Sequence, residues 1–160
     1  MAKLKFEGLK EYEAKLLQLR NVTKEMLGEA IYEGAAIVAD AVKANIETIP
    51  IDERYAAKGE KLYGISSEQK AGLIDGFGIA RLKDDNGYLN VKLGFAGNNS
   101  VKTKRYPNGQ PNSTIARSVN SGSSFRQRIP FVDNAVKSTK SACEQKMKQK
   151  IDEAIGDVMS

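Results

Sequence analysis

Apolar residues recur every three or four positions near the start of the chain, which is the spacing of one face of an α-helix. Within residues 8–20 the pattern predicts a short amphipathic helix whose apolar face is formed by Leu9, Tyr12, Leu16 and Leu19. The sequence NVT at 21–23 predicts a break, since asparagine and threonine favour helix caps. A longer helix is then predicted over 23–48. Ile49-Pro50 ends it, because the residue before a proline avoids the α region.

The longer helix has one apolar stripe with small residues beside it. The stripe consists of Leu27, Ile31, Val38, Val42 and Ile46, and the small residues are Ala30, Gly34, Ala35 and Ala41. Small side chains let another backbone come close. We therefore expect another part of the chain to pack tightly along this helix.

The clearest β signal lies at 76–95, which reads GFGIARLKDDNGYLNVKLGF. Apolar residues approach and leave the DDNG turn in near alternation, and an Asn-Gly pair favours a two-residue turn. These features predict a β-hairpin. Before it, residues 51–66 lack periodicity and are expected to form a loop, and Ser66 or Ser67 is expected to cap a short helix, EQKAGLIDG.

After Gly97 the chain becomes polar, and residues 106–112 read YPNGQPN. Two prolines and an Asn-Gly step exclude regular structure there. Two interpretations follow: a plain surface connection, or a contact loop that touches another molecule. Asn112 or Ser113 is expected to cap a short helix, STIARSVNSG, that ends at Gly122.

A final long helix is predicted after Pro130, because proline fits the first turn, where its missing donor costs nothing. Its apolar stripe consists of Val132, Ala135, Val136, Cys143, Met147, Ile151, Ala154, Ile155 and Val158. Together the elements predict an α+β fold, with two long helices packed on a small antiparallel β-sheet and long polar loops. The prediction is a single domain, 1–160, with an N-terminal helical segment at 1–22, an α+β core at 23–160 and a loop region at 96–130.

Composition places the chain among ordinary soluble proteins, with 41% apolar and 28% charged residues. No apolar run approaches the roughly 20 residues that span a bilayer. The opening MAKLKFEGLK has no signal-peptide core behind its lysines, so a cytosolic origin is expected. Cys143 is the single cysteine, which excludes an internal disulfide. Its inward helical position favours a buried structural thiol over a reactive one.

The chain has no histidine. This excludes a Ser-His-Asp or Cys-His nucleophile pair, a His-ligated zinc and imidazole acid–base catalysis. No phosphate-binding glycine motif is present, and Asp84 with Asp85 fits a turn better than a metal-binding pair. We therefore predict that the protein is not an enzyme and takes no cofactor or metal. An enzyme that works with carboxylates is kept as a third hypothesis.

The net charge of +5 belongs to the middle of the chain. Residues 86–132 contain no aspartate or glutamate, and their basic residues are Lys92, Lys102, Lys104, Arg105, Arg117, Arg126 and Arg128. One interpretation is a solvated basic surface. The other is a patch that faces an acidic partner subunit or DNA. Tyr106 and Phe125 are the only aromatic residues near the arginines, which is too few for a base-stacking platform.

Several segments together resemble a known family. They are FEGLKEYEAKLLQL, a long helix containing AIYEGAAIVADAVKANI, the loop to GFGIA, then YPNGQPN, IARSVNSGSSFR and IPFVDNAV. In this order and spacing they are similar to tailed-phage neck proteins of the gene-product-ten-like family. These are the head–tail joining or tail-completion components of long-tailed phages and prophages. The chain departs from the family pattern at KAGLIDGFG, which lacks an arginine, and at Asp133-Asn134, where a basic-proline pair is common.

The resemblance implies a non-enzymatic virion structural protein that acts as a ring-forming adaptor in assembly. Its partners would be neighbouring copies of itself and adjoining connector or tail proteins, with contact to the packaged DNA on the ring axis. It would reside in the virion neck or tail, and in the bacterial host cytoplasm during assembly. The candidate partner contacts are Lys102, Lys104, Arg105, Tyr106, Arg117, Arg126 and Arg128.

Arginine suits such contacts because its guanidinium pairs directionally with carboxylates. Reversing the charges of Arg126 and Arg128 is expected to reduce assembly without unfolding the subunit. The alternative function is a non-specific nucleic-acid-binding protein that uses the acid-free segment 86–132, with strongly salt-dependent affinity for duplex DNA.

Overall fold

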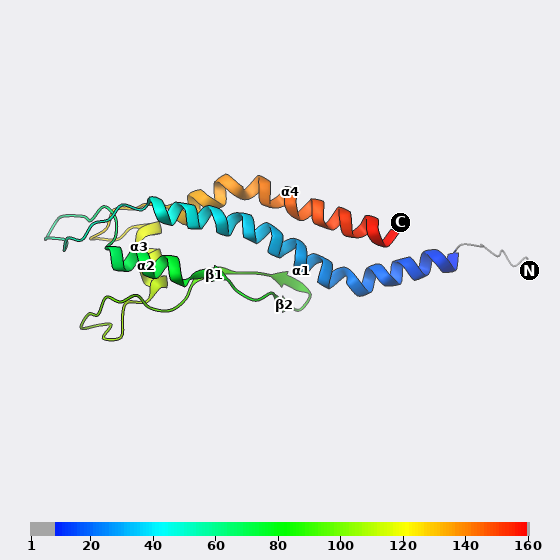
Figure 1. Ribbon diagram of the computed structural model, residues 1–160, viewed down its shortest axis with the longest axis horizontal. Coiled ribbons are helices and arrows are strands. Elements are labelled where there is room, and N and C mark those ends of the chain that lie inside the picture. Colours follow the sequence, from blue (N-terminus) through cyan, green and yellow to red (C-terminus); the bar gives the residue numbers. More distant parts are fainter. Residues whose placement is uncertain (1–8, 160) are drawn as a thin grey trace, which may run out of the picture.

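Two long helices determine the shape of the molecule. The computed structural model describes residues 9–159, with side chains described mainly from residue 23 onward. Helix α1 (Leu9–Thr48) and helix α4 (Phe131–Met159) lie side by side and run antiparallel along the long axis (Figure 1). Neither these helices nor the shorter ones among residues 9–159 are both long and apolar enough to cross a bilayer.

Helix α1 is continuous, so the predicted break at 21–23 is wrong. Asparagine, valine and threonine cost a helix interior only tenths of a kcal/mol each, and none of them removes a backbone donor. Such a segment ends a helix only where the chain also turns. The predicted apolar face of Leu9, Tyr12, Leu16 and Leu19 lies outside the described side chains. The predicted end before Pro50 is confirmed, since α1 stops at Thr48.

The close approach expected along α1 occurs at Gly34. A Cβ atom at that position would lie 2.7 Å from the Cγ of Met147 and 3.0 Å from the Sγ of Cys143, both on α4. At the other end of the helix pair, the Asn45 side-chain amide donates to the carbonyl oxygen of Phe131 at 2.9 Å. The small residue therefore lets α4 pack closely, and the amide fixes where α4 begins relative to α1.

Helix α2 (Ser67–Gly76) is capped by Ser66, one of the two expected caps, and the cap is part of a capping box. The Ser66 hydroxyl accepts from the backbone N–H of Gln69 at 3.2 Å, and the Gln69 side chain accepts from the N–H of Ser66 at 3.0 Å. This reciprocal pair satisfies two donors that a helix start leaves free.

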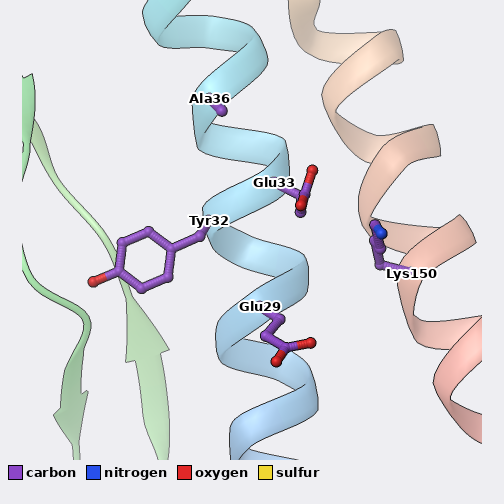
Figure 2. Close-up of a pocket in the computed structure, with 5 residues that line it drawn as sticks. All are labelled: Glu29, Tyr32, Glu33, Ala36 and Lys150. Atoms are coloured by element: carbon purple, nitrogen blue, oxygen red, sulfur yellow. The ribbon is translucent and has the colours of Figure 1, made fainter.

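The predicted hairpin is present in two parts. Strand β1 (Phe77–Ile79) pairs with β4 (Leu93–Phe95), and β2 (Lys83–Asp85) pairs with β3 (Tyr88–Asn90), both antiparallel. Asn86 and Gly87 have φ angles of 55° and 90°, which is the left-handed geometry of a tight hairpin turn. The hairpin and α4 flank α1 on different sides (Figures 1 and 2).

Helix α3 (Asn112–Ser121) ends at Gly122 as predicted, with φ 76°, but neither Asn112 nor Ser113 caps it. Pro111 holds the cap position and no side chain bonds there. Asn112 points inward instead, and its amide donates to the carbonyl of Ala96 at 2.9 Å. The Asn112 side-chain oxygen, which a helix cap would use as its acceptor, is buried and has no hydrogen-bond partner among the described residues.

The core lies where the helix pair meets α2, α3 and the first hairpin pair. Its fully buried large side chains are Val42, Ile46, Ile49, Ile65, Leu73 and Val119. The Phe95 ring packs between those of Phe77 and Phe131, with centroids 5.0 and 6.0 Å apart. The architecture is α+β, as predicted. Because the core sits at one end of the helices, it also anchors the loops that meet there.

Candidate interaction surface

Three polar loops gather at the end of the molecule where α1 stops and α4 begins (Figure 1). They span residues 49–66, 96–111 and 122–130. The first and third are joined by backbone bonds: the N–H of Leu62 donates to Phe125 O at 2.9 Å, and the N–H of Gln127 donates to Leu62 O at 2.8 Å. We call this region the loop end.

The loop that contains YPNGQPN is internally bonded. The Asn99 side-chain oxygen accepts from the N–H groups of Val101 at 2.9 Å and Gln110 at 3.2 Å, and the Asn99 N–H donates to Gln110 O at 2.9 Å. Gly109 has φ 106°, and a Cβ there would lie 2.1 Å from Asn99 O. The Gln69 side-chain amide donates to the side-chain oxygen of Gln110 at 2.9 Å, and this bond connects the loop to α2. These bonds give the loop one defined shape.

Six of the seven predicted contact residues are accessible to a partner, although they do not form one cluster. Lys102, Lys104 and Arg105 are exposed on the same loop, and the Arg105 guanidinium lies 5.5 Å from the ring centre of the half-buried Tyr106. Arg117 is exposed on α3.

Arg128 is exposed at the third loop and pairs with Asp133 at 3.2 Å. Only the loop 96–111 therefore brings several of the predicted residues together.

Arg126 is placed differently from the prediction, since only 4% of it is exposed. One guanidinium nitrogen, Nη1, donates to the carbonyl of Gly64, and Nε donates to the Ser118 hydroxyl at 3.0 Å. Burial lowers the pKa of Arg126, and the charge of Asp52 acts in the opposite direction. Arg126 thus links the first loop to α3. This placement argues against the expectation that its charge can be reversed without unfolding, because a carboxylate there could donate neither bond.

A hollow of about 480 Å³ opens between the loops and α2. Arg126 lines it, and the aromatic side chains at its edge are Tyr55 and Phe125. The Arg54 guanidinium donates from Nε and Nη2 to the two oxygens of the Asp52 carboxylate, each at 2.9 Å. The backbone N–H of Tyr63 donates to the same carboxylate at 3.1 Å. These bonds hold the pKa of Asp52 well below its usual range.

Large apolar side chains are exposed at the loop end. Tyr55 is 99% exposed, Tyr63 57%, Ile51 50% and Phe125 47%. Sequence reasoning missed this group, because residues 51–66 have no periodicity from which to infer a face. The available signal was the presence of tyrosines and an isoleucine in a segment that showed no pattern of burial.

A second surface lies along α1. Figure 2 shows Glu29 and Glu33 on the side of α1 nearer to Lys150 of α4, while Tyr32 points toward the hairpin. The Tyr32 hydroxyl accepts from the N–H of Leu82 at 2.6 Å. The depression between these side chains has a volume of about 290 Å³. Because Glu29 and Glu33 are both exposed, this surface is acidic and accessible.

The remaining groups with possible metal or thiol chemistry are the carboxylates and Cys143. Nowhere in 9–159 do three potential ligands from His, Cys, Asp and Glu come together as a metal site. Asp84 accepts from the N–H of Gly87 at 2.7 Å and pairs with Lys24 at 2.8 Å, which agrees with its interpretation as a turn residue. Cys143 is half-buried against Gly34, and burial raises the pKa of its thiol, which favours the neutral thiol over the nucleophilic thiolate.

Comparison of this chain with protein-family models, with curated proteins and with solved structures found no match.

Proposed function

We propose that this protein is a structural adaptor of the head–tail connector or tail-completion region of a phage or prophage virion. It acts there without catalysis, as a ring-forming subunit that joins copies of itself to the adjoining connector or tail proteins. The resemblance of its segments to neck proteins motivates the proposal. The observation that best supports it is the loop end, where a rigid helical scaffold carries exposed aromatic and basic side chains together.

The chemistry of the loop end suits protein contacts. Tyrosine and arginine are enriched where interface energy concentrates, because each offers a large contact area and directional polar groups. Here Tyr55, Tyr63 and Phe125 are exposed beside the basic loop 96–111. The bonds of Asn99 and Gln110 give that loop a defined shape before binding, which lowers the ordering cost of a contact.

The alternative is non-specific binding to nucleic acid. Lys102, Lys104 and Arg105 favour it, because three exposed cations on one loop can contact phosphates. Two of the arginines in the acid-free segment are already engaged, Arg126 inside the fold and Arg128 with Asp133. Few phosphate contacts remain, so the expected affinity is weak and falls with salt. A weak affinity of this kind is compatible with a subunit that contacts the DNA on the axis of a ring.

The deciding experiment is to locate the protein in phage particles released by cells that encode it. Particles are purified, their proteins are identified by mass spectrometry, and an antibody against the chain is imaged by immunogold electron microscopy. Gold at the junction of head and tail is the expected result. Absence of the chain from intact particles, together with tight duplex DNA binding by the purified protein, would overturn the proposal in favour of the alternative.

A further inference from the structure

The charges on the loop 96–111 are all of one sign. The loop contains no aspartate or glutamate, and Lys102, Lys104 and Arg105 are exposed on it. None of the three is in an ion pair with a described residue. Lys104 and Arg105 also lie outside the hollow beside α2, whose lining carries charges of both signs. The charge that this loop presents is therefore positive, and it favours an anionic partner.

Lys104 and Arg105 form the tip of a closed turn. The N–H of Thr103 donates to Tyr106 O at 3.0 Å, and the N–H of Tyr106 donates to the Thr103 hydroxyl at 3.0 Å. The Arg105 guanidinium lies 5.5 Å from the centre of the Tyr106 ring. Because these contacts fix the turn before binding, a contact made there loses less conformational entropy. We call residues 103–106 the basic turn.

Helix α1 presents charge of the opposite sign. Its exposed carboxylates follow one face at intervals of four and seven, none is in an ion pair with a described residue, and they are Glu25, Glu29, Glu33, Asp40 and Glu47. We call these residues the acidic face.

Nearby cations do not balance the acidic face. Lys43 is exposed on the same side of α1, and the half-buried Lys150 of α4 borders the depression beside Glu29 and Glu33. Lys150 also pairs with Glu153 at 3.9 Å. Five carboxylates therefore face two lysines. Carboxylates four residues apart on a helix repel one another, so cations from outside the subunit would stabilise α1.

We propose that the basic turn docks on the acidic face of a second copy of this chain. Charge complementarity favours this occupant, because the turn carries only cations and the face carries an excess of carboxylates. The Glu29 and Glu33 carboxylates border an open depression, so the turn of a neighbouring copy can reach them (Figure 2). Arg105 can hold such a carboxylate through two parallel hydrogen bonds.

The two surfaces differ, so the contact is heterologous and can pass from copy to copy until a ring closes. It is one form of the self-association included in the proposed function, and it rests on that proposal. Duplex DNA is the competing anionic partner of the basic turn. The few cations on this loop would neutralise few phosphates, which makes DNA the less favoured of the two.

The contact is read directly by crosslinking the full chain with a carbodiimide, which joins a lysine amine to a carboxylate with loss of water. Isotope-labelled and unlabelled chains are mixed in equal amounts at low salt, so that mass spectrometry recognises peptides joined between two copies. The expected crosslinks between copies join Lys102 or Lys104 to Glu25, Glu29 or Glu33. They should become rarer at high salt, because exposed charges are screened.

Charge reversal then tests whether the two surfaces meet. Lys104→Glu with Arg105→Glu reverses the basic turn, and Glu29→Lys with Glu33→Lys reverses the acidic face. Each variant alone should associate about tenfold more weakly than the wild type in sedimentation equilibrium at low salt. A chain that carries both pairs of substitutions should regain association, because its charges are complementary again.

Two controls keep the test decisive. Lys137→Glu with Lys148→Glu makes the same charge change as the turn variant on exposed residues of α4, and it should leave association unchanged. If circular dichroism shows that the turn variant unfolds, Lys104→Gln with Arg105→Gln replaces it.

A wild type that stays monomeric, crosslinks confined to single chains, or a combined variant that does not recover would overturn the inference. Loss of duplex DNA binding in the turn variant, with association unchanged, would also overturn it and would assign the turn to DNA. Immunogold labelling of particles can still succeed in each of these cases, so this failure and that of the proposed function are distinguishable.

Discussion

A Cβ atom on Gly34 of α1 would lie 2.7 Å from the Cγ of Met147 on α4, closer than real Cβ contacts come. Gly28, six residues earlier, faces Leu82 of the hairpin in the same way, with 2.8 Å to its Cδ2. Helix α1 therefore lies between α4 and the hairpin, and each of them can pack this closely only because α1 has a glycine at the contact. The helix pair carries the loop end, so its packing bears on the proposed function.

Gly34→Leu is expected to destabilise the protein by about 1–3 kcal/mol, because a leucine would push α4 away from α1. Thermal or urea unfolding followed by circular dichroism measures the loss. The matched control is Gly156→Leu on α4, where a Cβ atom would meet no other atom within 4 Å. Since leucine favours a helix more than glycine does, the control should keep or raise stability. Equal effects of the two substitutions would contradict a close contact between α1 and α4 at Gly34.

The start of α4 is capped by a residue of another helix. The Asn120 side-chain oxygen accepts from the N–H groups of Val132 at 3.0 Å and Asp133 at 3.2 Å. Asn120→Ala should therefore cost about 1 kcal/mol, as for other lost N-caps. Asn120→Asp keeps an acceptor and should retain most of the stability. Denaturant midpoints of the three proteins give the comparison, and an aspartate variant as unstable as the alanine variant would rule out capping.

Gly109 fixes the shape of the YPNGQPN loop. Its φ of 106° strains any other residue, and a Cβ would also collide with Asn99 O at 2.1 Å. Gly59 is a matched control, with φ 85° and nothing within 4 Å. Gly59→Ala should cost only the backbone strain of about 1–2 kcal/mol, whereas Gly109→Ala should cost more. Urea unfolding of the two variants beside the wild type gives the comparison.

Hydrogen exchange localises the effect. In the Gly109→Ala variant the N–H of Gln110, which bonds to Val101 O and to the Asn99 side chain, should lose protection. Unchanged protection at Gln110 would mean that the loop does not depend on this glycine.

Features whose determinants lie within a few residues were predictable from the sequence. The capping box of Ser66 and Gln69 and the Asn86-Gly87 turn are of this kind, since three residues or fewer separate the partners. The cap of α4 was not predictable, because it comes from Asn120 on α3. The burial of Arg126 depends on Gly64, 62 positions away. Charge and composition could not distinguish this arginine from the exposed ones.

The ends of helices also fall into those that the local sequence determines and those that tertiary contacts determine. Pro50 ends α1 through its own ring, which any chain with that sequence would share. The residues at 21–23 allow a helix to end but do not force it to, so the packing of the rest of the chain determines that the helix continues there. For the candidate surface, the basic loop 96–111 was visible as an acid-free segment. The exposed tyrosines at 55 and 63 were not, because exposure in an aperiodic segment leaves no pattern.

Acid should loosen the loop end through Asp52. The Arg54 side chain and the backbone N–H groups of Arg54 and Tyr63 lower the pKa of this carboxyl from its ordinary value of 3.8. The unfolded chain therefore binds a proton at higher pH than the folded one does. Stability from this group is present above the ordinary pKa and is lost as pH falls below it, through the folded pKa.

Comparison with Asp52→Asn isolates that contribution, because the depressed pKa values of Glu53 and Asp84 act in both proteins. The variant should be less stable than the wild type near neutral pH, and the difference should shrink as the pH is lowered below about 4. Urea unfolding at neutral pH and at two acidic pH values measures it. Arg54→Gln should reproduce the neutral-pH loss, since it removes the guanidinium that holds the carboxylate. A difference that stays constant with pH would show that Asp52 supports the loop by its shape and not by its charge.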